Sequence, residues 1–339
     1  MGFKGYVLRR ALSGIPVFIG LSILIFTLAR VLPGDPARLA LGPRASDEAV
    51  QSLRDQMGLD QPIVVQYFEY MAGLVRGDMG IALTTNRNVA SDLLYFFPAT
   101  LELIIVGMII AMVFGIPLGV IAGKNKDRFE DNASRLFAFF GVSMPAFWAA
   151  ILLQLVFAFY LGLLPATGRI GVDAPPRLTG LMLVDSLIAT DFAALRSALA
   201  HLVLPAFTLA LAPMADIARM TRSSFIEEFN KDYVHSLHSS GVPGKLIAYK
   251  YVLKASFAAT MTIIALDFGF LIGSAFLIEI VFAWPGMARY GVNAILENDI
   301  NAIIGVTLVV GLVFIVANMV VDILYGYFDP RVRYGGEHE

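Results

Sequence analysis

Long apolar stretches alternate with polar segments along this chain. The apolar stretches cover residues 11–31, 99–123, 136–163, 202–218, 257–282 and 302–327. A lipid hydrocarbon core of roughly 30 Å requires about 20 apolar residues in helical form, and a helix satisfies its own backbone polar groups there. The pattern therefore predicts an all-α membrane protein with six transmembrane helices, the last five of which form a core over residues 99–327.

The composition agrees with this class of protein. Hydrophobic residues make up 58% of the 339 residues and charged residues only 15%, and the mean hydropathy is +0.73. These values are too apolar for an average soluble domain. The sequence contains no cysteine, which excludes disulfides and thiolate metal sites.

The first apolar stretch follows Lys4, Arg9 and Arg10, and so has the charge pattern of a signal peptide. However, it is longer than the roughly 7 to 15 apolar residues of a signal peptide, and no small-residue cleavage pattern follows it. We therefore predict that residues 1–31 form a cytoplasmic N-terminus and a retained first span.

Basic residues indicate the orientation, because short connections rich in Lys and Arg stay in the cytoplasm. They gather in the N-terminus, in residues 124–135 and 219–254, and in the tail, residues 328–339. This distribution predicts that both termini are cytoplasmic. It places a large periplasmic insertion, residues 32–98, after the first span and a second external insertion at residues 164–201.

A charged segment, residues 219–256, connects the fourth and fifth apolar stretches. Asn230 or Asp232 can cap a helix there, and Gly241 followed by Pro243 ends it after about two to three turns. A helix of this length is too short to cross a membrane.

One face of this short helix is predicted to be apolar, since Tyr233, Val234 and Leu237 lie at positions i, i+1 and i+4. Such a stripe on a cytoplasmic helix either lies in the lipid headgroup region or fills a groove on a partner protein. Because the neighbouring spans enter and leave the segment directly, a push on this helix would tilt both spans. The layout is that of a coupling element.

The segment also carries a family resemblance. Asp-Tyr-Val at 232–234, with a glycine eight residues after the tyrosine, resembles the cytoplasmic "EAA" loop of binding-protein-dependent ATP-binding-cassette (ABC) importer permeases in the dipeptide, oligopeptide and nickel branch. Similar landmarks in the same order cover nearly the whole chain. They are "RR" at 9–10, "LPGDPAR" at 32–38, "MGLDQP" at 57–62, "RGDMG" at 76–80, "PATLEL" at 98–103, "GVSMPAFW" at 141–148, "HLVLPAFTLA" at 201–210, "ARMTRSS" at 218–224, "VFAWPG" at 281–286 and "DILYGYFDPRVR" at 322–333.

The resemblance implies the type I ABC importer permease architecture in a bacterial inner membrane. It implies as partners a second homologous permease subunit, two ABC ATPase subunits and a periplasmic solute-binding protein, with lipid around the spans and no nucleic acid. ATP and magnesium would be bound by the ATPase subunits, so this chain would hold no cofactor.

The resemblance also implies roles for particular residues. The residues that would couple the chain to the ATPase are Asp232, Tyr233, Val234, Leu237, Gly241 and Lys254. The residues that would form the periplasmic mouth of the route are Trp284, Pro285 and Gly286.

The coupling segment departs from the family pattern at several positions. Relatives read Arg-Thr-Ala-Arg-Ala-Lys-Gly where this chain reads "HSLHSSG" at 235–241, so three basic positions are lost. Relatives read Arg-Asn-Ala, followed by a proline, where this chain reads "KASFAAT" at 254–260, so that only Lys254 keeps its charge.

Acidic side chains within apolar stretches are candidates for the solute route, because charges there are costly and face a cavity or a partner. The acids in such surroundings are Glu102, Asp216, Asp267, Glu279 and Asp322. Asp267, with Glu102 as a second candidate, is predicted to line the route; the others lie near span ends, where pairing or solvation is expected. Gly269 and Gly273 are four residues apart, which suits close contact between the two permease halves.

The sequence does not indicate catalysis. A phosphate-binding loop has the form G-x-x-x-x-G-K-[ST], whereas "GVPGKL" at 241–246 has a different spacing and contains a proline. The serine, histidine and acidic residues form no convincing nucleophilic constellation. His235 and His238 lie at i and i+3 but lack a third metal ligand nearby. We therefore predict a non-catalytic transport subunit without a metal site.

Two other classes of function stay open from the residues alone. An ion-coupled secondary transporter could use Asp267 or Glu102, although such carriers commonly show inverted repeats and no clear repeat is visible here. The second class is a scaffold protein that has no path for a solute. The spans do not choose among dipeptides, oligopeptides, glutathione and nickel complexes as the solute.

Overall fold

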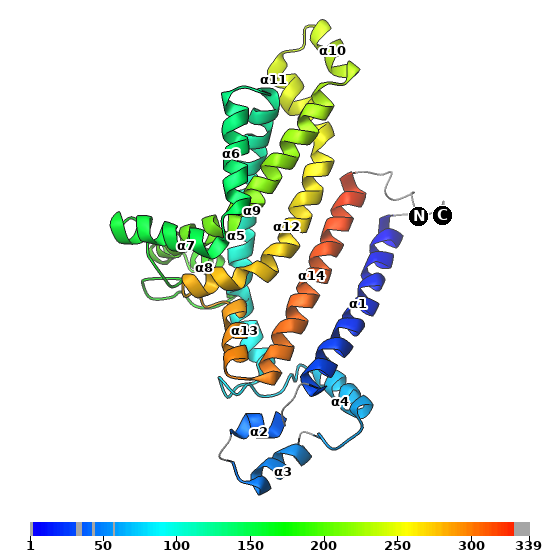
Figure 1. Cartoon of the computed structure of the whole chain (residues 1–339), viewed down its shortest axis with the longest axis vertical. Helices are drawn as coiled ribbons and strands as arrows, with labels where there is room; N and C mark the ends of the chain where they lie inside the picture. The colour runs from blue at the N-terminus through cyan, green and yellow to red at the C-terminus, as the bar shows by residue number, and fades with distance from the viewer. Residues whose placement is uncertain (1–2, 32–35, 43–44, 57, 329–339) are drawn as a thin grey trace. The chain divides into compact units, whose positions relative to one another are not determined.

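The structure is a computed structural model that describes residues 3–31, 36–42, 45–56 and 58–328 (Figure 1). The helices are α1 (Phe3–Val31), α2 (Pro36–Leu41), α3 (Asp47–Gln56), α4 (Ile63–Val75), α5 (Val89–Lys124), α6 (Phe129–Ser143), α7 (Ala146–Leu153), η1 (Gln154–Tyr160), α8 (Met182–Ile188), α9 (Phe192–Phe229), α10 (Asp232–Ser239), α11 (Gly244–Leu246), η2 (Ile247–Val252), α12 (Leu253–Val281), α13 (Met287–Leu296) and α14 (Ile300–Phe328). Both η segments are π-helical. The predicted cytoplasmic tail lies outside the described residues beyond residue 328.

Among the described residues, five helical stretches are long and apolar enough to cross a membrane, or six if one bent pair is counted as a span. The five are α1, α5, α9, the continuous run α11–η2–α12, and α14. The prediction of an all-α membrane protein is therefore confirmed.

The predicted third span, residues 136–163, is wrong as a single straight helix. Helix α6 ends at Ser143 and α7 begins at Ala146, and the two are bent by 105°. Met144 is extended (φ −80°, ψ 124°) because it precedes Pro145, which disfavours helical geometry in the residue before it. An apolar run thus gives the hydropathy of one span while the backbone changes direction in the middle.

The chain forms two compact units. The first contains Met1–Arg10, Leu101–Trp284 and Ala317–Glu339, and the second contains Ala11–Thr100 and Pro285–Val316. Helix α9 is the centre of the first unit, where α6, α7, α8 and α12 all pack against it. Its 38 residues correspond to roughly 57 Å of helix, which exceeds the thickness of a bilayer core.

Glycines of α5 allow its backbone to approach α9 closely. A methyl group at Gly115 would lie 2.8 Å from the carbonyl oxygen of Met214, and one at Gly119 would lie 2.6 Å from that of Ala218. Gly123 continues the same stripe. Small residues at four-residue spacing are typical of helix pairs that pack through their backbones in membranes.

Replacing Gly119 by leucine is therefore expected to destabilise the first unit by about 3 kcal/mol, the upper end of overpacking costs. The yield of monodisperse protein after detergent extraction and heating checks this. The matched control is Gly20→Leu in α1, because nothing lies within 4 Å of a methyl group placed there. Equal heat resistance of the two variants would contradict the close α5–α9 contact.

The second unit has its own core, formed by the first turns of α5 and α14 together with α13 and the segment before α5. Ala82, Val89, Met287 and Ala294 are buried in it, and Phe96 stacks on Tyr290 with ring centroids 5.1 Å apart. The buried Asp299 carboxylate accepts hydrogen bonds from the backbone N–H of Leu83 (2.6 Å), Thr84 (3.2 Å) and Ala302 (3.1 Å). This carboxylate ties the segment before α5 to the start of α14.

Candidate functional site

The short helix predicted between the fourth and fifth spans exists as α10. Its N-cap position is held by Lys231, without a side-chain cap hydrogen bond, so the expected cap by Asn230 or Asp232 is wrong. Asn230 instead ends α9, and Asp232 lies in the first turn of α10, where its charge suits the positive end of the helix dipole.

The predicted turn at Gly241 is confirmed. Gly241 has φ +75°, a left-handed conformation that favours glycine. Its N–H donates to the carbonyl of His238 (3.0 Å), and the N–H of Val242 donates to that of Leu237 (3.1 Å). Pro243 then begins α11, so that the chain turns back directly into the fifth span.

Apolar contacts fasten α10 to the ends of three long helical segments. Val234, only 1% exposed, belongs to a buried cluster with Val120 of α5, Phe225 of α9, and Ile247 and Val252 of η2. We call these residues the coupling cluster. Leu237 and Phe229 pack against it from the side.

The predicted apolar stripe of α10 thus divides into an inner and an outer part. Val234 and Leu237 face the coupling cluster, whereas Tyr233 is 36% exposed. Partial burial and a hydrogen bond with Glu228 raise the pKa of Tyr233 to about 12. His235 and His238 are exposed, as is Lys254 in the first turn of α12. The surface that α10 presents outward is therefore polar and aromatic.

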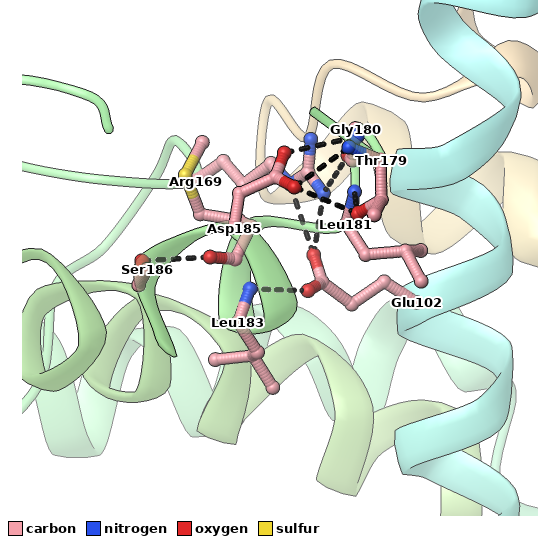
Figure 2. A network of polar contacts seen from close by, with 9 residues as sticks. Glu102, Arg169, Thr179, Gly180, Leu181, Leu183, Asp185 and Ser186 are labelled. Carbon is pink, nitrogen blue, oxygen red and sulfur yellow. Dashed lines mark hydrogen bonds and ion pairs between the residues drawn. The ribbon is translucent and has the colours of Figure 1, made fainter. Parts of the chain in front are cut away.

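The predicted residue Glu102 belongs to a polar network with the segment between η1 and α9 (Figure 2). Arg169 forms an ion pair with Glu102 of α5, with Nε and Nη2 at 3.1 and 2.5 Å from Oε2. The other oxygen of Glu102 accepts a hydrogen bond from the N–H of Leu183 (2.7 Å), and Arg169 also donates to the carbonyl of Gly180 (2.9 Å). Glu102 therefore holds a connecting segment on α5.

Asp185 belongs to the same network, because it and Arg169 both form hydrogen bonds with the backbone of Gly180. It accepts hydrogen bonds from Thr179 N (2.7 Å), Thr179 Oγ1 (2.8 Å) and Gly180 N (2.9 Å). Burial by itself would raise the pKa of Asp185, but these donors hold the pKa below its ordinary value. A carboxylate with a lowered pKa stabilises the fold above its unfolded pKa and loses that effect as the pH falls through the folded value, so the network is intact at neutral pH.

Trp284 lies against the same network. Its side chain is 1% exposed, and the Arg169 guanidinium carbon lies 5.7 Å from its ring centroid. Pro285 and Gly286 follow in the turn that leads into α13. No local pattern in the sequence indicates Arg169, because it is 67 positions from its carboxylate partner in α5.

Removing the charge of Arg169 is expected to be costly, because Glu102 is only 4% exposed and would be left unpaired. Arg169→Met should lower the free energy of unfolding by roughly 3 to 5 kcal/mol, as for other broken buried pairs. Thermal unfolding in detergent measures this, with the exposed Arg196→Met as the control. If Glu102→Gln combined with Arg169→Met is no more stable than Arg169→Met alone, the unpaired carboxylate is not the cause.

The remaining acidic candidates lie in different environments. Asp322 pairs with Arg10, and Asp216 pairs with Arg219 at 2.6 Å, as expected for acids near span ends. Asp267 of α12 has a buried carboxylate oxygen, Oδ2, without a hydrogen-bond partner among the described residues.

The two glycines of α12 differ as well. Gly269 is buried within the chain, while Gly273 is exposed and has nothing within 4 Å of a methyl group placed on it. Only the face at Gly273 is therefore open to another helix.

Comparisons with known proteins agree with this architecture. The family described as "Binding-protein-dependent transport system inner membrane component" matches residues 115–334, and its N-terminal domain matches residues 3–104. The chain belongs to this family. It is accordingly a permease subunit of a binding-protein-dependent ABC importer, and a multi-pass membrane protein.

Similar curated proteins carry peptide transport names. The chain is 38% identical to the probable D,D-dipeptide transport system permease protein DdpB of Escherichia coli (strain K12), over 99% of both chains. It is 39% identical to the dipeptide transport system permease protein DppB of Alkalihalophilus pseudofirmus, over 97% of this chain and 99% of the relative. It is 36% identical to the glutathione transport system permease protein GsiC of Escherichia coli O6:H1, again over 97% and 99%.

Proposed function

We propose that this chain forms half of the route by which an ATP-driven importer takes up small peptides into a bacterial cell. The similar permeases are named for D,D-dipeptides, dipeptides and glutathione, all of which are short peptides. A second homologous permease supplies the other half of the route. Two ATPase subunits bind ATP and magnesium, so this chain acts without a cofactor and without catalysis of its own.

The orientation follows from the basic residues. The connection between α5 and α6 begins after Lys124 and contains Lys126. The segment from the end of α9 to the start of α12 contains Lys231, Lys245 and Lys250. Such connections stay in the cytoplasm, so both termini are cytoplasmic and residues 32–98 are periplasmic. The periplasmic side, with Trp284, Pro285 and Gly286, then receives solute from the binding protein.

The burial of Val234 in the coupling cluster is the observation that best supports this mechanism. Because Val234 is buried against α5, α9 and η2, a displacement of α10 moves the ends of these long helical segments with it. The outward residues of α10, including Tyr233, contact the ATPase, while Val234 and Leu237 act as the internal fastening. The other residues at the edge of this contact with the ATPase are Asp232, Gly241 and Lys254.

Transport then proceeds through rigid-body states whose populations depend on nucleotide. ATP binding brings the cytoplasmic helices of the two permeases together and opens the route outward. Hydrolysis returns the route to its inward-facing state. Asp267 lies along the route, and Gly273 lies on the face that meets the other permease. Glu102 serves the route indirectly, by holding the segment around Arg169 in place.

Reconstitution in proteoliposomes tests this function. Uptake of radiolabelled alanyl-alanine is expected only when the second permease, both ATPases, the binding protein and ATP are all present. An ion-driven carrier would instead take up solute with this chain alone on a proton or sodium gradient. Uptake of that kind would overturn the proposal.

A further inference from the structure

The first unit carries a group of charged side chains on α9 and α12, which we call the charged layer. Asp216, Arg219 and Arg222 follow one another at three-residue steps on α9, so they share one side of the helix. Asp267 lies on α12. The side chain of Arg219 is 72% exposed, although it lies on a helix apolar enough to span a membrane.

The register between the two helices brings these charges to one level. Helix α9 runs toward α10 and α12 runs away from it, so the two are antiparallel (Figure 1). They are fixed to each other by a buried hydrogen bond between Thr221 Oγ1 and Thr260 Oγ1 (3.1 Å). From this bond, Asp216 lies roughly 7.5 Å along α9 and Asp267 roughly 10.5 Å along α12 in the same direction. The two carboxylates therefore stand within about one helical turn of the same level.

The pairing within this layer is incomplete. Arg222 pairs with the buried Asp131 of α6. Arg219 donates to Asp216 Oδ1 at 2.6 Å, while Asp267 Oδ2 is buried and has no hydrogen-bond partner among the described residues. Charges within membrane spans generally face a water-filled cavity or a partner rather than lipid. The layer thus offers one carboxylate and part of one guanidinium for further contacts.

Two hollows lie along α9, one N-terminal to Asp216 and one that Arg219 and Arg222 themselves line. The one nearer the middle of the helix is lined by Thr208, Pro213, Phe270 and Gly141, next to the break between α6 and α7. The one nearer α10 is lined by residues of α6 and α9, among them Phe139, Arg219 and Arg222. Arg219 thus lines this second hollow, while Asp267 lies three residues before Phe270, which lines the first.

We propose that Asp267 and Arg219 form a transient binding site for the charged ends of a zwitterionic peptide during its passage. The peptide ammonium group binds the Asp267 carboxylate, supported by Asp216, and the peptide carboxylate binds the exposed guanidinium of Arg219. The two charges lie on neighbouring helices and have the opposite signs that the two ends of a short peptide require. Because the guanidinium of Arg219 is shared with Asp216, binding of the peptide is weak, as release from a transport route requires. This inference rests on the proposed function.

The test uses the assembled importer in proteoliposomes, with radiolabelled alanyl-alanine as the probe. The number of peptides taken up per ATP hydrolysed is expected to fall by roughly tenfold in Asp267→Asn and in Arg219→Gln, the scale of one lost charged contact. Hydrolysis stimulated by the loaded binding protein should stay within about twofold of the wild-type rate. Asp267→Glu and Arg219→Lys should keep most of the uptake, and Arg196→Gln, an exposed charge at the other end of α9, should keep all of it.

Two results would overturn the inference. An unchanged ratio of uptake to hydrolysis in Asp267→Asn and Arg219→Gln means that the layer does not contact the peptide. A joint fall of uptake and hydrolysis that Asp267→Glu and Arg219→Lys share means that the layer is structural. Failure of the proposed function is a different result, in which the assembled wild-type importer hydrolyses ATP but takes up no peptide.

Discussion

Replacement of Val234 by aspartate is expected to abolish ATP-driven uptake while the chain still inserts into the membrane. Val234 is 1% exposed and packs against Val120, Phe225 and Ile247. A carboxylate in this cluster would be desolvated without a partner, at a cost of several kcal/mol, so α10 should detach from the long helices. Uptake in proteoliposomes should fall by at least about tenfold, which corresponds to only 1.4 kcal/mol of lost coupling.

The controls separate lost coupling from general damage. Val75→Asp introduces the same charge at a valine that is 84% exposed, and it should leave uptake close to wild type. Val234→Ala removes two methyl groups without adding a charge and should have an intermediate effect. If Val234→Asp transports as well as Val75→Asp, the coupling cluster does not transmit the motion of α10.

Replacement of Tyr233 by aspartate, together with His235→Asp, is expected to weaken binding of the ATPase. Both side chains are exposed on α10, so the change should leave the coupling cluster and membrane insertion unaffected. Aromatic residues at the centre of an interface commonly contribute at least about 2 kcal/mol, so the amount of ATPase that copurifies should fall by roughly thirtyfold. Quantitative copurification from membranes containing all subunits measures this.

Tyr233→Phe is the matched control, because it keeps the ring and removes only the hydroxyl group that bonds with Glu228. It should retain nearly all of the ATPase. Undiminished copurification with the double aspartate variant would show that α10 docks through other residues or does not dock at all.

Hydropathy predicts the spans well because it measures the property that a bilayer selects. It cannot detect the bend at Met144 and Pro145, since both halves are apolar and a proline does not by itself decide the outcome. Pro205 and Pro213 lie inside the continuous helix α9, whereas Pro145 follows an extended residue and ends a helix. The presence of a proline in an apolar stretch therefore does not by itself predict where a helix ends.

In helix α10, too, the local sequence predicts some features, and only the tertiary structure determines the others. The sequence predicts a short helix at residues 232–239 and its end at Gly241, because turn residues act locally. It places Tyr233 and Val234 on one face, although residues next to each other on a helix are about 100° apart. Only the neighbouring helices determine that Val234 is buried and Tyr233 exposed.

Long-range partners could not be predicted from spacing. Glu102 is a candidate for the solute route on sequence grounds because it lies in an apolar stretch. Its ion pair with Arg169 depends instead on how the segment between α7 and α9 folds back onto α5. The glycine stripe of α5 did have a signal, the four-residue spacing of Gly115, Gly119 and Gly123. The same spacing at Gly269 and Gly273 of α12 places only one of the two glycines in a buried position, so spacing alone does not identify an interface.

Chemical crosslinking from α10 tests the central claim most directly. The sequence contains no cysteine, so His235→Cys gives this chain a single thiol on the exposed face of α10, and Val172→Cys gives one in the segment between η1 and α8. In membranes that contain the whole importer, a short thiol-to-amine crosslinker should join His235→Cys to an ATPase subunit and should not join Val172→Cys to one. An assembled importer in which His235→Cys captures no ATPase, or captures no more than Val172→Cys, would contradict the account.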